Sequence, residues 1–339
     1  MKEINFITIG DNNFFPFIHL SIKKLIKFYP LSKIYIYDWG FNHLQRKKLE
    51  SYYNTIIIDW TAKLNKFNGY KEIIKNYQGY NPPFDYRLKE YLFNQKPICI
   101  LDCSKRINEN LVYLDGDAIL INPIDEIFKN DFDIGITTVP KTIIDRENKD
   151  YLRILNAGVM FFNLNSKKMQ IFIQEWIKKI EIVREFLIEQ TSLFYLIKDK
   201  NNDIFRKENN VGTIELSKIS YKIKNFSCLK YNYYFYWFRY NYPLFKYRYQ
   251  NKKIKILHFI KSEDYTIFFQ IKEYIREIKL RDIILKLLKF FPPRIKYYLE
   301  KSYFLNLIAK LIIKYLNFYN IINIISELAK LRNWIKEIP

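Results

Sequence analysis

The sequence predicts an α/β fold with one mostly parallel central sheet, and two observations support this class. Apolar runs of strand length alternate with amphipathic segments of helix length, starting near the beginning of the chain. The chain also has 339 residues, of which 49% are hydrophobic, and this is enough to bury a sizeable core. We therefore expect one large domain over residues 1–264 and a helical extension over residues 265–339.

The elements of this sheet can be assigned in order along the chain. Strands are predicted at 4–10, 33–39, 55–60, 111–114, 118–121, within 156–166, and at 254–261. Helices are predicted near 14–28, 71–77, 84–106 and 167–182, and in a further segment that holds Glu189 and Gln190, with breaks at Pro82, Pro83 and Pro97. Ligands of parallel sheets bind at the carboxyl ends of the strands, where Asp11 and Asp115 are expected.

The run LVYLDGDAILINP, residues 111–123, places two carboxylates two residues apart where an apolar strand ends. Carboxylate oxygens are hard ligands suited to Mg²⁺ or Mn²⁺, and such an ion can hold a diphosphate against the acids of a protein. The alternative is an exposed hairpin turn, for which Asp-Gly-Asp is common. Exposed hairpins alternate polar and apolar residues, however, and the apolar runs on both sides of Gly116 do not. Asp115 and Asp117 are therefore candidate metal ligands.

His258 is the candidate third ligand. The chain holds three histidines, and the other two, His19 and His43, stand in helical or turn segments without neighbouring acids. His258 ends an apolar strand, so a parallel sheet would bring it to the same edge as Asp115 and Asp117. Mn²⁺ accepts this mixture of oxygen and nitrogen ligands.

Two further segments have open interpretations. In NAGVMFFNLNS, residues 156–166, small residues precede an apolar strand, and Gly158 serves either the close approach of a ligand or packing. The tyrosine-rich run KYNYYFYWFRYNYP, residues 230–243, would form either a stacking platform for a sugar or the edge of a core.

Taken together, these motifs resemble the family-8 glycosyltransferases, which have the GT-A fold, over roughly residues 4–262. The resemblance rests on LVYLDGDAILINPIDEIF and LNAGVMFFNLNS, followed by an acid and a glutamine on a helix and then His-Phe. It implies a UDP-sugar donor and a Mn²⁺ or Mg²⁺ ion held by Asp115, Asp117 and His258. It also implies Asp11 near the uracil or ribose, and Asn156, Ala157, Glu189 and Gln190 around the transferred sugar.

The sequence departs from the family pattern at two places. The family has a glycine three residues and a lysine six residues after the histidine, and here these positions are Lys261 and Asp264. We expect Lys261 to contact the diphosphate from its shifted position, with Lys96 as the alternative, because either ammonium can act as a point charge. Glu189 stands where many relatives have aspartate, so the donor preference can differ.

The resemblance implies transfer of a hexose, glucose or galactose, with retention of the anomeric configuration and Gln190 lining the sugar face. An inverting enzyme would instead need a carboxylate that deprotonates the acceptor, and the candidates are Glu189, Glu263 and Asp264. The acceptor expected from the resemblance is a glycan or glycolipid of cell-surface polysaccharide or lipopolysaccharide synthesis.

A formal net charge of +21 favours an anionic partner, and sugar phosphates, anionic lipid and nucleic acid are all candidates. The extension over residues 265–339 is predicted as basic amphipathic helices, which suit an anionic membrane surface. Lys310 and Lys314 interrupt its best apolar stretch, so it is not expected to span a membrane. The alternative is packing on the large domain or on another subunit of a homo-oligomer.

The remaining features bear on location and on competing functions. Cys99, Cys103 and Cys228 have neither the spacing of a zinc site nor an even count, which favours a reducing cytoplasm, and the first residues hold no apolar secretion signal. We expect a cytoplasmic protein, peripheral on the inner face of the membrane. A basic nucleic-acid-binding protein is the competing class, but no binding motif is present. A catalytically inactive nucleotide-sugar-binding protein is a third interpretation, which the complete Asp115, Asp117 and His258 set disfavours.

Overall fold

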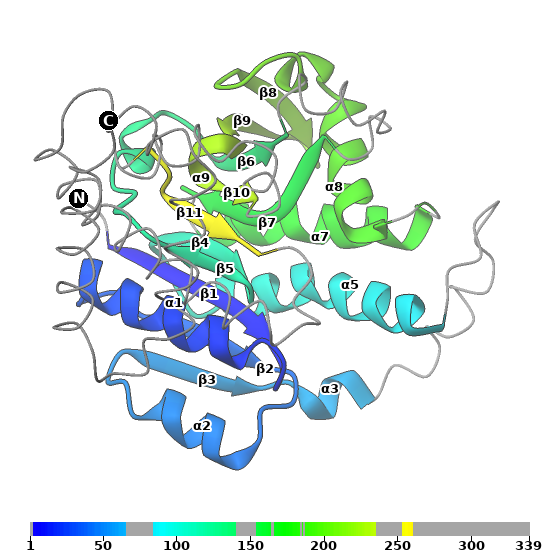
Figure 1. The fold of residues 1–339 in the computed structure, drawn as a ribbon. Coiled ribbons are helices and arrows are strands. Elements are labelled where there is room, and N and C mark those ends of the chain that lie inside the picture. Colours follow the sequence, from blue (N-terminus) through cyan, green and yellow to red (C-terminus); the bar gives the residue numbers. More distant parts are fainter. Residues whose placement is uncertain are drawn as a thin grey trace, which may run out of the picture. The chain divides into compact units, whose positions relative to one another are not determined.

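The computed structural model describes residues 3–65, 84–139, 154–163, 166–183, 185, 187–234 and 253–259 (Figure 1). The helix predicted near 71–77 and the extension predicted over 265–339 lie outside the described residues. Within these residues, no helix is both long enough and apolar enough to cross a membrane.

An eight-stranded sheet forms the centre of the fold, with the strand order β3-β2-β1-β4-β7-β6-β9-β8. Its strands are β1 (Ile4–Gly10), β2 (Ile34–Asp38), β3 (Thr55–Asp59), β4 (Asn110–Asp115), β6 (Ile134–Thr138), β7 (Leu155–Phe162), β8 (Val211–Leu216) and β9 (Ile219–Ser227). The pairs β1–β2, β2–β3, β1–β4 and β6–β9 are parallel, whereas β7 is antiparallel to both β4 and β6, and β8 is antiparallel to β9. The predicted α/β class with a mostly parallel central sheet is confirmed.

A second sheet of three short strands was not predicted. It contains β5 (Ala118–Leu120), β10 (Tyr233–Tyr234) and β11 (Ile256–His258), in the order β10-β11-β5. The strand that ends at His258 therefore does not belong to the central sheet, and it runs antiparallel to β5. The chain passes from the central sheet to this second sheet at Gly116, between β4 and β5.

The helices are α1 (Phe15–Phe28), α2 (His43–Glu50), α3 (Thr61–Asn65), α5 (Phe84–Ser104), α7 (Ser166–Ile182), α8 (Ile188–Lys198) and α9 (Cys228–Tyr231), with 3₁₀ turns η2 (Ile127–Lys129) and η4 (Asn202–Phe205). The predicted helices at 14–28, 84–106, 167–182 and around Glu189 are present, whereas three further helices, α2, α3 and α9, were not predicted. The predicted breaks at Pro82 and Pro83 lie outside the described residues. The break predicted at Pro97 is wrong, because this residue lies inside α5. Cys99, Ile100 and Cys103 of the same helix are buried in the core, and this packing outweighs the hydrogen bond that proline removes.

The core lies on both faces of the central sheet, which explains why its strands are continuous apolar runs. Ile7 and Ile9 of β1 belong to one cluster, together with buried residues of α5, α7 and α8. Ile4 and Phe6, which alternate with them, belong to a second cluster with α1. A strand that is covered on both faces has no polar side to alternate.

Candidate active site

The turn between β4 and β5 positions the two aspartates. Asp115 is the last residue of β4 and pairs in register with Ile9 of β1, so it lies at the carboxyl end of the parallel part of the sheet. Asp117 immediately precedes β5. Gly116 between them lies so close to β1 that a Cβ atom there would be 2.6 Å from the Ile9 carbonyl oxygen. A side chain at this position would push the turn, and both carboxylates with it, away from the sheet.

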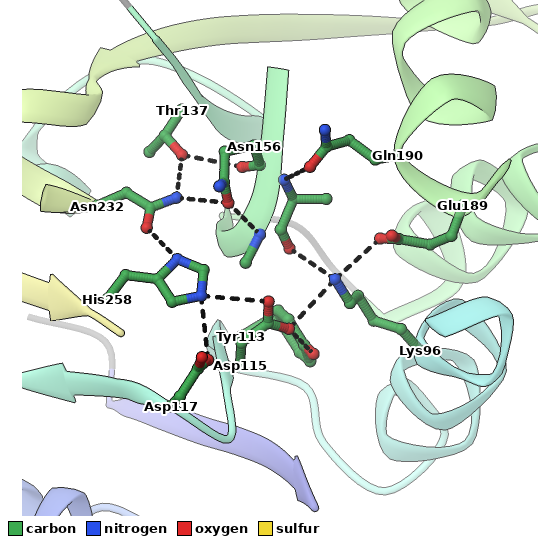
Figure 2. Close-up of polar contacts among 12 residues, drawn as sticks. Lys96, Tyr113, Asp115, Asp117, Thr137, Asn156, Glu189, Gln190, Asn232 and His258 are labelled. Carbon is green, nitrogen blue, oxygen red and sulfur yellow. Dashed lines mark hydrogen bonds and ion pairs between the residues drawn. The ribbon is translucent and has the colours of Figure 1, made fainter. Parts of the chain in front are cut away.

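His258 joins these aspartates by pairing of β11 with β5. In the register of this antiparallel pair His258 is opposite Ala118, and the Phe259 N–H donates to the Asp117 carbonyl oxygen over 3.0 Å. His258 Nε2 lies 3.1 Å from Asp117 Oδ1 and 3.6 Å from Asp115 Oδ2 (Figure 2). The predicted convergence is therefore present, but the predicted route, one edge of a single parallel sheet, is wrong.

These three residues form a group that could hold a metal ion. One ligand atom from each lies within 4.8 Å of the others. Burial and the neighbouring Asp115 raise the pKa of Asp117, while His258 opposes this rise. Burial lowers the pKa of His258, but Asp117 and Asp115 offset this effect, and the net shift is upward. Two carboxylates and an imidazole packed this closely favour positive charge between them, and they fit the donor set of a divalent cation.

A buried lysine lies beside the metal candidates. Lys96 of α5 is 5% exposed, and its Nζ lies 3.2 Å from Asp115 Oδ1 and 3.0 Å from Glu189 Oε1. It also donates to the Ala157 carbonyl oxygen over 3.4 Å. Burial lowers the pKa of Lys96, but the two carboxylates bring about a net rise. Burial, opposed by Lys96 and supported by Asp115, raises the pKa of Glu189 to about 7.

The first turn of α8 carries Glu189 and Gln190 and is held by a second carboxylate of α5. Glu90 accepts hydrogen bonds from the N–H groups of Leu187 (2.7 Å) and Ile188 (3.1 Å). Leu187 has no side-chain cap of its own, so Glu90 satisfies the free N–H groups at this helix start. Burial is the main cause that raises the pKa of Glu90 to about 7.

Strand β7 contributes Asn156 and Ala157, two of the four residues expected around the sugar. Gln190 Oε1 accepts from the Ala157 N–H over 3.3 Å, and Asn156 Oδ1 accepts from the Gly158 N–H over 2.7 Å. A Cβ atom on Gly158 would lie 2.6 Å from Asp115 Oδ2 and would also collide with the His258 ring. Gly158 therefore makes room for the side chains of the site itself. The four predicted sugar residues come together around Lys96 and β7, and their contact with a sugar stays a prediction.

Of the other predicted site residues, Asp11 lies among the described residues and the rest do not. Asp11 follows β1 at the same sheet edge, and its Oδ1 accepts from the N–H groups of Asn13 (2.8 Å) and Phe14 (3.3 Å), ahead of α1. Its contact with a nucleotide stays a prediction. Lys261, Glu263 and Asp264 lie outside the described residues, as does most of the tyrosine-rich run.

The sequence interpretation missed the polar residues behind the site. Tyr113 donates its hydroxyl to Asp115 Oδ1, and Asn232 contacts His258 from the side opposite the aspartates (Figure 2). Thr137 and Glu90 were missed as well. The one available signal was an asparagine between Tyr231 and Tyr233, because a polar residue within an aromatic run is often buried with hydrogen-bond partners.

Comparison with known proteins gives matches among solved structures alone, since no family model and no curated protein matches the chain. The chain is similar to the galactosyltransferase LgtC in complex with donor and acceptor sugar analogues (14% identity, TM-score 0.45, covering 76% of this chain and 87% of that chain). It is also similar to apo mouse xyloside xylosyltransferase 1 (13%, 0.44, 76% and 97%) and to the glycosyltransferase GlyE of Streptococcus pneumoniae (17%, 0.42, 76% and 55%). All three are glycosyltransferases, the class that the motifs resemble.

Proposed function

We propose that this chain is a metal-dependent glycosyltransferase that moves a hexose, glucose or galactose, from a UDP-sugar to a glycan or glycolipid acceptor. The observation that carries this proposal is the convergence of Asp115, Asp117 and His258, whose ligand atoms lie within 4.8 Å of one another. Ions such as Mn²⁺ and Mg²⁺ complete such a partial set of protein ligands with phosphate oxygens and water. A nucleoside diphosphate supplies those oxygens.

In this proposal, Asp115, Asp117 and His258 hold the ion, which would neutralise negative charge on the departing diphosphate. Lys96 has a different task from the one considered in the sequence, where it was the alternative diphosphate contact. Its ammonium already has three oxygen partners, from Asp115, Glu189 and Ala157. It therefore holds the metal side and the sugar side of the site together, and Lys261 remains the proposed diphosphate contact.

We assign Asn156, Ala157, Glu189 and Gln190 to the transferred sugar, and Asp11 to the nucleoside. Retention fits this assignment, because no enzymic base is then required and Gln190 lines the sugar face. Inversion would need a base, and Glu189 is the candidate among the described residues, although its carboxylate forms an ion pair with Lys96. The anomeric configuration of the product, determined by NMR, decides between the two stereochemical courses.

The acceptor and the location extend this proposal beyond the described residues. We propose a cell-surface polysaccharide or lipopolysaccharide acceptor, met by a cytoplasmic enzyme at the inner face of an anionic membrane. The support is the net charge of +21 and the basic amphipathic pattern of residues 265–339. Contact of that segment with another subunit is the alternative.

The test is UDP release from a panel of UDP-sugars with Mn²⁺, without acceptor. We expect slow hydrolysis of one donor, which falls by about 100-fold or more in Asp117→Asn and in chelator. Asp199→Asn is the control, because Asp199 forms a solvent-exposed ion pair with Lys179 and should keep wild-type release. Failure of every donor to bind or react would overturn the proposal and favour a nucleic-acid partner. Binding of a donor without turnover, even with acceptors present, would indicate an inactive nucleotide-sugar-binding protein.

A further inference from the structure

A fully buried asparagine holds His258 from the side that faces away from the aspartates. Asn232 is 0% exposed, and its Oδ1 lies 2.8 Å from His258 Nδ1. Its Nδ2 donates to Thr137 Oγ1 over 2.8 Å and to Asn156 Oδ1 over 2.9 Å. Figure 2 shows His258 between this asparagine on one side and Asp115 and Asp117 on the other.

The neighbours of Asn232 determine which way its amide points. Asn156 Oδ1 accepts from the Gly158 N–H, so Asn156 presents an oxygen, and only an N–H group of Asn232 can face it. Thr137 donates its single hydroxyl proton to the Asn156 carbonyl oxygen, so it too can only accept from Asn232. Both protons of the Asn232 amide are therefore used, and its oxygen is the atom that faces His258.

The orientation of this amide in turn selects the protonated nitrogen of the imidazole. An amide oxygen can only accept, so His258 Nδ1 must carry a proton. In the neutral ring the lone pair is then on Nε2, which points to Asp117 Oδ1 and Asp115 Oδ2. Three electron-rich atoms face one another in this tautomer, and a cation between them satisfies all three.

We propose that Asn232 is a positioning residue that fixes Nε2 of His258 as the metal-ligating nitrogen. This inference rests on the metal-dependent function proposed above. Thr137, Asn156 and His258 come from β6, β7 and β11, and Asn232 lies between α9 and β10. Their hydrogen bonds join the metal ligand to β7, which carries the proposed sugar residues Asn156 and Ala157. The network therefore holds the ligand in place before an ion or a donor binds.

The test is the affinity of the full chain for Mn²⁺ alone, measured by titration calorimetry without donor. We expect Asn232→Leu to weaken Mn²⁺ binding by about 10- to 100-fold, as loss of the partner of a metal-bound histidine does. Asn232→Asp should bind Mn²⁺ more tightly than Asn232→Leu but less tightly than wild type, because a carboxylate oxygen can still accept the Nδ1 proton but cannot donate to Thr137 and Asn156. Wild-type affinity in a folded Asn232→Leu protein would overturn the inference.

Asn225→Leu is the matched control. Asn225 is also 0% exposed, accepts one side-chain hydrogen bond from Thr138, and donates two, to the carbonyl oxygens of Ile204 and Lys207. These partners are not site residues, so its loss should disturb the fold to a similar extent while Mn²⁺ affinity stays within about twofold.

A second measurement needs no variant and applies even if Asn232→Leu does not fold. In the Mg²⁺-loaded wild-type protein with ¹⁵N-labelled histidine, we expect the ring proton of His258 on Nδ1. A proton on Nε2 would overturn the inference. Absence of Mn²⁺ and Mg²⁺ binding in the wild-type protein would instead overturn the proposed metal-dependent function, so the two failures are distinguishable.

Discussion

Substitution of Lys96 by methionine tests whether the charges of the site are balanced as the structure indicates. Methionine has nearly the same length as lysine, so the change removes the ammonium and keeps most of the packing. Lys96 and Glu189 are both buried, and the lysine also pairs with Asp115. Removal of one partner from a buried ion pair destabilises a protein by about 3–5 kcal/mol, because the remaining charge has no compensation.

The cost should depend on pH, because Glu189 can take up a proton. Its folded pKa of about 7 already lies above the ordinary glutamate value of 4.5, a rise that corresponds to about 3 kcal/mol. Lys96 opposes this rise, so the pKa should move higher still in the variant. A carboxyl group whose pKa is raised by folding stabilises the folded state fully when the pH is below its pKa in the unfolded chain. This stabilisation is lost as the pH rises through its pKa in the folded protein. We therefore expect Lys96→Met to lose about 2 kcal/mol at pH 5.5 and about 4 kcal/mol at pH 8.

The assay is urea denaturation at both pH values, with chelator present so that no ion replaces the lysine. Lys179→Met is the control, because its pair with Asp199 lies at the surface, with side chains 28% and 51% exposed, and should be worth less than about 1 kcal/mol at either pH. Addition of Glu189→Gln to Lys96→Met should recover part of the loss at pH 8. Equal losses at pH 5.5 and pH 8, or no loss at pH 8, would refute this account of the charges.

Three further predictions concern the site, the fold and the surface. Gly158→Ala should abolish both UDP release and Mn²⁺ binding, measured by calorimetry, because the new Cβ atom would lie 2.6 Å from Asp115 Oδ2. Glu90 has a folded pKa of about 7, raised mainly by burial, so it contributes to a loss of wild-type stability between pH 4.5 and 7. Glu90→Gln should make this pH dependence weaker by up to about 3 kcal/mol in urea denaturation, and an unchanged slope would contradict the assignment. The full chain should co-float with anionic vesicles and be released by about 0.5 M salt; equal binding to neutral vesicles would argue against an electrostatic contact.

The sequence predicts elements well where a segment is buried on both faces or amphipathic along its length. Residues 4–10 were predicted as a strand and form β1, because side chains on both of its faces are buried. The segment 14–28 was predicted as a helix and forms α1, with its buried side facing the sheet. The second sheet could not be predicted, because β5 and β11 are three residues long and their pairing joins distant parts of the chain.

In the site too, residues in local patterns could be predicted, whereas residues that act through distant partners could not. Asp115 and Asp117 stand within a recognisable motif, and His258 is one of only three histidines, so local pattern was enough to identify them. Asn232 and Glu90 act through partners that are distant in sequence. Asn232 is 26 residues from His258, and Glu90 is 97 residues from Leu187. No spacing rule relates such pairs, because their contact depends on how whole elements pack.

The charge of the site has the opposite sign to the charge of the chain, and this suggests an order of binding. The chain carries +21 overall, which would attract the proposed anionic nucleotide-sugar from a distance. Close to β4, however, Asp115 and Glu189 contact the ammonium of Lys96, and Asp117 contacts His258. With a neutral imidazole, the carboxylates outnumber the ammonium and would repel a free diphosphate. A divalent cation reverses the local balance, so the donor should bind together with the ion or after it. The affinity for UDP should therefore depend steeply on Mn²⁺, and equal UDP affinity in chelator would show that the carboxylates do not face the diphosphate.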